Sequence, residues 1–133
     1  MNSSSLISVV DDDESVRESL ESLLKSAGFQ VKAFEAAEDF LNSEQLDKTG
    51  CLILDVRLGG MSGLELQRGL IANFYSVPII FITAHGDEAM RARVMADGAV
   101  DFLLKPFGEE ALLAAVETAL NHGGRAAKQD RKT

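Results

Sequence analysis

CLILD, residues 51–55, is the stretch that decides the fold, because an apolar run stops there at an acidic residue. Three other apolar runs stop in the same way, each at a charged or reactive side chain: LISVV (6–10) at Asp11 and Asp12, VPIIFI (77–82) at Thr83, and VDFLL (100–104) at Lys105. The carboxyl ends of parallel strands share one edge of a sheet. We therefore expect these polar side chains to converge in one crevice at that edge.

Short apolar runs alternate along the chain with segments of helical periodicity. We expect strands near 6–11, 29–34, 50–55, 77–82 and 100–104, and helices near 14–27, 36–43, 63–73, 87–97 and 109–121. The second and fifth strands carry polar residues, which is typical of sheet edges, whereas the other three are almost continuously apolar. The sequence therefore predicts an α/β protein with a flavodoxin-like, doubly wound (βα)5 fold and a parallel sheet in the order 2-1-3-4-5.

Length and charge limit the class of protein. A chain of 133 residues with 46% hydrophobic content fits one domain, which we place at residues 1–122, followed by a linker or flexible tail at 123–133. The tail carries four basic residues against Asp130, so the overall net charge of −8 leaves −11 for residues 1–122. Such an acidic domain is not expected to contact nucleic acid directly, because that binding depends on neutralising phosphates.

The chain shows no sequence signal for a membrane or for secretion. No apolar run reaches the ~18 residues of a membrane helix, and MNSSS at the N-terminus does not resemble a secretory signal. We expect a cytoplasmic protein that makes no membrane contact. The single cysteine, Cys51, lies within an apolar run and is predicted to be a buried, unreactive thiol.

The residues at the strand ends suit phosphoryl chemistry at a metal ion. Carboxylates drawn together repel one another and favour a bound cation, and Mg²⁺ prefers one or two carboxylates together with a phosphate oxygen. Asp11 or Asp12, together with Asp55, is predicted to bind the ion, and Mn²⁺ is expected to substitute for Mg²⁺. Asp55, at the end of the central strand, is predicted to be the nucleophile that forms an aspartyl phosphate. Thr83 and Lys105 are expected to donate to the phosphoryl oxygens.

Four longer motifs resemble a known family. VVDDDES, DVRLGGMSGLEL, FITAHGD and GAVDFLLKPF, within residues 6–120, resemble the receiver domain of two-component response regulators. MSGLELQR, PIIFITAHGD and GAVDFLLKPF are especially similar to the FixJ-like group, whose receivers usually precede a helix-turn-helix DNA-binding domain. The resemblance implies a phosphorylation-activated signalling switch, with transcriptional control in a longer parent protein. It implies no enzyme activity beyond self-phosphorylation and autodephosphorylation.

The resemblance also gives each site residue a role. It implies that Asp11 and Asp12 help to hold Mg²⁺, and that the main-chain carbonyl of Arg57 is a further ligand. Asp55 would accept phosphate from the phosphohistidine of a sensor histidine kinase. Lys105 matches the lysine that contacts the phosphoryl group, and the Lys105-Pro106 bond is usually cis in this family.

A second set of residues matches the switch of the family. Thr83 and Phe102 match the pair that relays phosphorylation, in which the movement of Thr83 lets Phe102 turn inward. The surface around the fourth helix, fifth strand and fifth helix then changes, and in relatives it dimerises or meets the effector. A phosphorylation-dependent homodimer is therefore expected. Arg57 and His85 lie where related receivers tune the lifetime of the phosphate, although a plain surface-loop histidine is an equal reading of His85.

One motif departs from the family. Gly59 stands where proline is common, four residues after the phosphorylated aspartate, so LGGMSG (58–63) contains three glycines. Glycine leaves φ unrestricted whereas proline fixes it. We therefore expect a more mobile loop and altered rates of phosphorylation or dephosphorylation.

Other interpretations of the same residues are weaker. Asp13, unlike its two neighbours, is expected to cap the following helix, since acidic residues favour the N-terminal end of the helix dipole. A haloacid-dehalogenase-type phosphatase would place the nucleophile at the first aspartate, but no Asp-Asp pair follows Lys105, and Asp55 would have no role. The chain could also be a pseudo-receiver that only docks partners. The complete set of an acidic pair, Asp55, Thr83 and Lys105 argues against this interpretation.

Overall fold

Five parallel strands form one sheet in the order β2-β1-β3-β4-β5, as the sequence predicts. The computed structural model describes the backbone of residues 5–132 and the side chains of residues 5–121. The strands are β1 (Leu6–Val10), β2 (Gln30–Phe34), β3 (Thr49–Asp55), β4 (Ile79–Thr83) and β5 (Asp101–Leu104). The helices are α1 (Glu14–Ser26), α2 (Ala37–Leu41), the short 3-10 helix η2 (Leu46–Lys48), α3 (Gly63–Ala72), α4 (Glu88–Ala96) and α5 (Glu109–Lys132).

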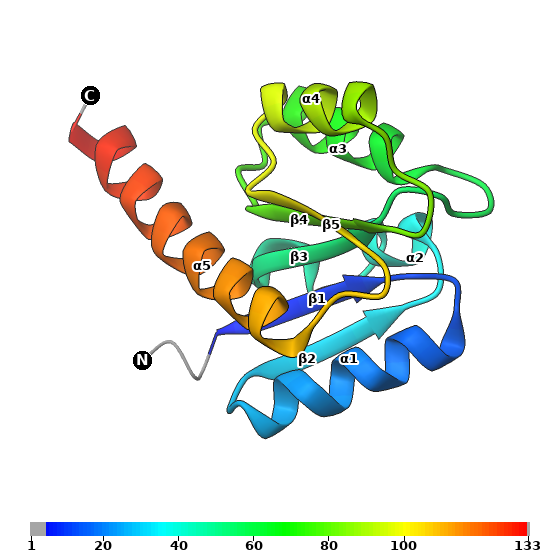
Figure 1. The fold of residues 1–133 in the computed structure, drawn as a ribbon. Coiled ribbons are helices and arrows are strands. Elements are labelled where there is room, and N and C mark those ends of the chain that lie inside the picture. The colour runs from blue at the N-terminus through cyan, green and yellow to red at the C-terminus, as the bar shows by residue number, and fades with distance from the viewer. Residues whose placement is uncertain (1–4, 133) are drawn as a thin grey trace.

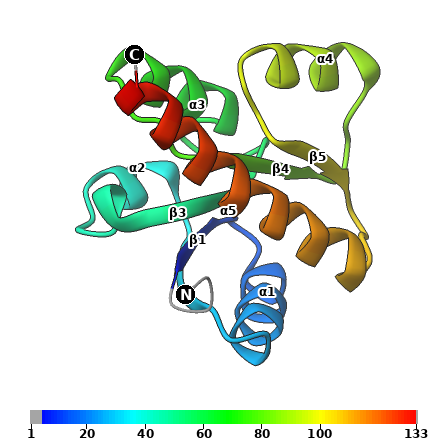
Figure 2. The same ribbon diagram turned by 90° about the vertical axis from the view of Figure 1, so that its left-hand side faces the viewer.

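Helices cover both faces of the sheet, so the strands are buried on two sides (Figures 1 and 2). On one face α1 and α5 pack against β1, β3 and β4 through side chains such as Leu20 and Leu112. On the other face α2, α3 and α4 contribute Phe40, Leu66 and Val94 to a second core. This two-sided burial explains the almost continuous apolar runs of the three inner strands.

Local capping fixes where the first and third helices begin. The carboxylate of Asp13 accepts hydrogen bonds from the amides of Ser15 and Val16, which confirms its predicted role as a helix cap. Ser62 and Glu65 form a reciprocal capping box at the start of α3, because each side chain accepts a hydrogen bond from the backbone amide of the other. These caps set the lengths of two loops that begin at the carboxyl edge of the sheet.

Two elements differ from the sequence expectation. The backbone of α5 continues through Gly123 and Gly124 to Lys132, whereas the predicted helix ends at 121. Each glycine disfavours a helix by only about 1 kcal/mol, and the Ala, Arg, Lys and Gln residues that follow are good helix formers. The division into a domain at 1–122 and a tail at 123–133 stays a prediction. The sequence also gave no sign of the short 3-10 helix η2 that precedes β3.

Two further expectations concern burial. Cys51 is fully buried in the sheet, and this burial raises the pKa of its thiol to about 12, as expected of an unreactive cysteine. Within the portion of the chain described, no helix combines the length and the apolar character needed to cross a bilayer.

Candidate functional site

Strand register brings the predicted site residues together at the carboxyl edge of the sheet. In the β1–β3 pair Val10 lies opposite Leu54, so the next residues, Asp11 and Asp55, leave the sheet side by side. Asp55 pairs with Ile82 of β4, which places Thr83 one residue farther along the same edge. On the outer side Thr83 pairs with Leu104, and the amide of Lys105 donates to the Thr83 carbonyl at 2.8 Å.

Three carboxylates form the centre of this edge. One carboxylate oxygen each of Asp11, Asp12 and Asp55 lies within 4.8 Å of the other two. Asp11 is fully buried and Asp55 is 5% exposed, whereas Asp12 faces solvent. The cluster is therefore half enclosed, with its open side at Asp12.

Lys105 neutralises the two buried carboxylates. Its Nζ lies 2.9 Å from Asp11 Oδ2 and 3.3 Å from Asp55 Oδ2, so one ammonium bridges both acids. Burial, and next the negative charge of Asp11, raise the pKa of Asp55 above its ordinary value. Burial alone would lower the pKa of Lys105, but the bonds to Asp11 and Asp55 outweigh it and raise this pKa. The lysine is therefore held in its charged form.

Backbone amides fix the orientation of both buried acids. The amide of Asp13 donates to Asp11 Oδ1 at 2.9 Å, and the amide of Arg57 donates to Asp55 Oδ1 at 3.1 Å. In each acid the Oδ1 atom is thus bound to the backbone and the Oδ2 atom to Lys105. The site holds its carboxylates in one arrangement before any ligand arrives.

The donor set fits a hard divalent cation. Octahedral Mg²⁺ with oxygen ligands at 2.0–2.1 Å keeps neighbouring ligand oxygens about 3 Å apart and opposite ones about 4 Å apart. Carboxylate oxygens within 4.8 Å of one another need only a small approach to reach that spacing. All of the candidate donors are oxygens, which Mg²⁺ and Mn²⁺ prefer over nitrogen and sulfur.

A hydrogen bond joins the backbone amide of His85 to the side chain of Thr83. Thr83 is fully buried, and its hydroxyl oxygen accepts a hydrogen bond from the amide of His85 at 3.2 Å. The His85 side chain itself is exposed in the loop after β4. An exposed position is compatible with both interpretations of His85, as a residue that tunes the phosphate lifetime and as an ordinary loop residue.

Phe102 already lies inside the protein. Its side chain is 6% exposed, and a Cβ atom placed on Gly86 would come within 2.6 Å of the ring atom Cζ. The ring therefore occupies space that only a glycine leaves free. The ring is thus already buried in this structure, and its movement on phosphorylation stays a prediction.

Three contacts of the site have no local signal in the sequence. The guanidinium of Arg17 donates to the Asp11 carbonyl at 2.7 Å, and that of Arg91 donates to the Phe102 carbonyl at 3.3 Å. The carboxylate of Glu38 accepts a hydrogen bond from the amide of Met61, in the loop that follows β3, at 3.0 Å. The first spans the turn between β1 and α1, six residues apart, and the other two join elements that only the tertiary fold brings together.

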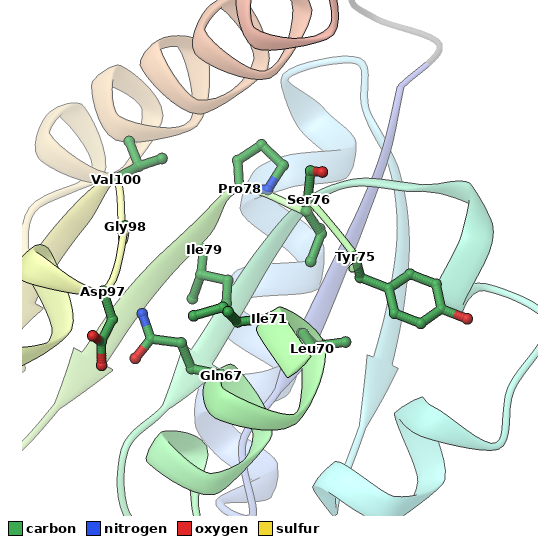
Figure 3. Close-up of a pocket in the computed structure, with 11 residues that line it drawn as sticks. Gln67, Leu70, Ile71, Tyr75, Ser76, Pro78, Ile79, Asp97, Gly98 and Val100 are labelled. Atoms are coloured by element: carbon green, nitrogen blue, oxygen red, sulfur yellow. The ribbon is translucent and has the colours of Figure 1, made fainter. Parts of the chain in front are cut away.

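A hollow elsewhere in the molecule lacks the features of a reactive centre. It has a volume of about 210 Å³ and lies at the amino ends of β4 and β5, opposite the carboxylates, between α3 and the chain at Pro78 and Val100 (Figure 3). Its lining is mainly apolar, and its carboxylate, Asp97, is paired with Arg68 at 4.0 Å. The charged groups that converge are those at the opposite edge.

Comparisons with known proteins point to one family. Residues 7–117 match the response regulator receiver domain family. The response regulator protein TmoT of Ectopseudomonas mendocina is 51% identical over 116 residues, which cover 87% of this chain and 53% of TmoT. The transcriptional regulatory protein FixJ of Bradyrhizobium diazoefficiens is 42% identical over 124 residues, which cover 93% of this chain and 60% of FixJ.

A solved structure of a response regulator has a similar fold. A low-resolution structure of the response regulator StyR matches with a TM-score of 0.89 and 48% identity, over 97% of this chain and 65% of that chain. This chain spans about half the length of the curated relative TmoT. The likeness to FixJ confirms the predicted FixJ-like group. The chain therefore belongs to the response regulator receiver domain family, and it is a signalling domain switched by phosphorylation rather than a catalytic enzyme.

Proposed function

We propose that Asp55 is the phosphoacceptor of this receiver domain and that Asp11, Asp12, Asp55 and the main-chain carbonyl of Arg57 hold Mg²⁺, for which Mn²⁺ can substitute. The observation that carries the proposal is the position of Lys105, whose Nζ lies within 3.3 Å of both Asp11 and Asp55. A cation that bridges two buried acids marks the place where the negative oxygens of a phosphoryl group find a partner.

The chemistry is the transfer of a phosphoryl group from nitrogen to oxygen. A carboxylate oxygen of Asp55 attacks the phosphorus of a phosphohistidine, the P–N bond of the donor breaks, and an acyl phosphate forms. Because burial and Asp11 raise the pKa of Asp55, the charged form that attacks needs nearby positive charge. Lys105 supplies one such charge, and a bound divalent ion supplies the other. Thr83 and Lys105 then bind the new phosphoryl oxygens.

The partner that donates phosphate is a sensor histidine kinase, which we expect to meet this domain in the cytoplasm. A mostly apolar hollow of about 590 Å³ lies beside Lys105, between α1 and the loop after β5. It is lined by Leu20 and Leu23 on one side and by Pro106 and Phe107 on the other. A donor helix seated there would reach Asp55 from the open side of the site.

The output follows from the switch residues. Thr83, bound to the new phosphoryl group, gives up its present bond to the His85 amide, and the loop between β4 and α4 takes a new path. Arg91 ties α4 to the Phe102 carbonyl, so that change reaches the surface of α4, β5 and α5. This surface controls a homodimer or an effector, and in a longer parent protein it controls transcription. Autodephosphorylation, tuned by Arg57 and His85, resets the switch.

The test is phosphorylation by acetyl phosphate followed by intact-mass spectrometry and site mapping. The wild-type protein should gain one hydroxylamine-labile phosphoryl group, only with Mg²⁺ or Mn²⁺ present, and Asp55→Asn should gain none. Asp47→Asn is the matched control, because it removes an exposed carboxylate at the amino end of β3, far from the site. Labelling of Asp55→Asn, or a label mapped to Asp11 as in the phosphatase interpretation, would contradict the assignment.

A further inference from the structure

The loop between β3 and α3, residues 56–62, carries part of the proposed metal site. Arg57 lies in it and donates its amide to Asp55 Oδ1 at 3.1 Å. Two residues later come Gly59 and Gly60, and Gly60 has a φ of +75°, which glycine adopts at little cost. A loop of this composition has many accessible paths, so something must select the one that places Arg57 correctly.

Hydrogen bonds from the two flanking elements hold only the ends of the loop. The Arg57 amide is bound by Asp55, the last residue of β3, and the Ser62 amide is bound by Glu65 of α3. The Met61 amide is different, because its acceptor is Oε2 of Glu38 at 3.0 Å, on α2 and 23 residues earlier in the chain. Glu38 thus ties the glycine-containing part of the loop to a separate helix.

The fit around Glu38 is close. A Cβ atom placed on Gly60 would lie 2.9 Å from Glu38 Oε2, so the carboxylate occupies the space that the absent side chain leaves. The bond from the Met61 amide lowers the pKa of Glu38, as expected when an amide donates to the charged form of an acid. A charged acceptor makes a stronger hydrogen bond to an amide than a neutral one.

We propose that Glu38 is a positioning residue for phosphoryl transfer: by holding Met61 it fixes the path of the loop and hence the placement of Arg57 beside Asp55. This role rests on the proposed function of Asp55 and extends it to a residue outside the site. Glu38 also restrains the loop where Gly59 leaves it free, because the contact from α2 limits paths that a proline at this position would have limited.

The experiment compares three variants. Glu38→Ala removes the acceptor, and Glu38→Gln keeps an acceptor oxygen but removes the charge. Asp39→Ala is the matched control, because Asp39 is the other exposed acid in the first turn of α2, so the loss of charge near the helix N-terminus is the same. Each protein is measured in three ways: exchange of the Met61 amide hydrogen by NMR, Mg²⁺ affinity by calorimetry, and the rate of labelling by acetyl phosphate.

We expect Glu38→Ala to speed exchange at Met61, to weaken Mg²⁺ binding and to slow labelling, each by roughly three- to tenfold, the range for one hydrogen bond. Glu38→Gln should recover most of each loss, and Asp39→Ala should match the wild type. The proposal is overturned if Met61 exchange is unchanged in Glu38→Ala, if exchange rises while metal affinity and labelling stay at wild-type values, or if Asp39→Ala has the same effects. Failure of the proposed function is distinguishable, because wild-type protein would then lack the label on Asp55, whereas exchange and metal affinity would still report on Glu38.

Discussion

Lys105 is the residue that lets two buried carboxylates lie side by side. Its ammonium is 2.9 Å from Asp11 and 3.3 Å from Asp55, and its side chain is 19% exposed. Without a bound cation, this lysine is the positive charge in direct contact with both acids. Its removal leaves two acids facing each other in a partly buried site, which is costly.

We predict that Lys105→Ala destabilises the metal-free protein by on the order of 2–3 kcal/mol, somewhat less than for a fully buried pair because the lysine is partly exposed. Saturating Mg²⁺ should restore more stability to this variant than to the wild type, while signalling is lost. Urea denaturation with and without Mg²⁺ measures this, and Lys48→Ala, at an exposed lysine away from the site, is the control. A variant as stable as the wild type without Mg²⁺ would show that the acids do not depend on the lysine.

At the scale of a single residue, sequence reasoning succeeded where strand ends determine position. Asp55 and Thr83 are the last residues of β3 and β4, and Asp11 and Lys105 directly follow β1 and β5. The sheet order fixes which of them are neighbours. Glu38 could not be found in this way. It is an exposed acid among many, and its contact with Met61 depends on how the loop folds back over α2.

Among the elements, the loop between β3 and α3 contains two adjacent glycines, Gly59 and Gly60. Within the described residues Gly59 has no positive φ, its N–H takes part in no hydrogen bond, and a Cβ atom placed on it meets nothing within 4 Å. Gly60, the next residue, has a φ of +75°. The two glycines therefore place different demands on a substitution.

We predict that Gly59→Pro stabilises the domain by about 0.4–1 kcal/mol, because proline reduces the conformational entropy of the unfolded chain. Gly60→Pro should destabilise it, since proline cannot adopt a positive φ. Chemical denaturation of both variants, with and without Mg²⁺, tests the pair. Unchanged or lowered stability of Gly59→Pro would show that the loop needs the freedom of glycine at this position.

Element boundaries were predicted less well than element types. The apolar periodicity of the last helix identifies its start at Glu109, but the Gly-Gly pair suggested an end that the backbone does not have. Periodicity reports the face that packs on the sheet, and it carries no signal once a helix extends beyond the core. The starts of α1 and α3 were clearer because capping side chains mark them.

For the molecule as a whole, the switch that we propose is a shift between two arrangements of one surface. The surface formed by α4, β5 and α5 includes Leu104, which is 54% exposed, and lies next to the buried Phe102. Because Phe102 is already buried, the proposed switch would act through changes at Thr83 and α4. A ligand shifts such an equilibrium only by its preference for one state over the other.

We predict that beryllofluoride with Mg²⁺, as a mimic of the phosphoryl group, shifts the domain from monomer toward dimer in sedimentation velocity. Asp55→Asn, which is not expected to take up the mimic, should remain a monomer under the same conditions. A wild-type protein that stays monomeric with the mimic bound would exclude the homodimer as the output of this domain.

The pairing of Val10 with Leu54 has a consequence for how this gene tolerates insertions and deletions. Side chains alternate between the two faces of a strand, so loss of one codon within β1 or β3 turns every following side chain of that strand to the opposite face. The aspartate at its end would then point away from its partner, although no residue of the pocket had been replaced. Insertion or deletion of one codon in these two strands should therefore abolish phosphate acceptance, whereas the same changes in the segment between α2 and β3 should be accepted.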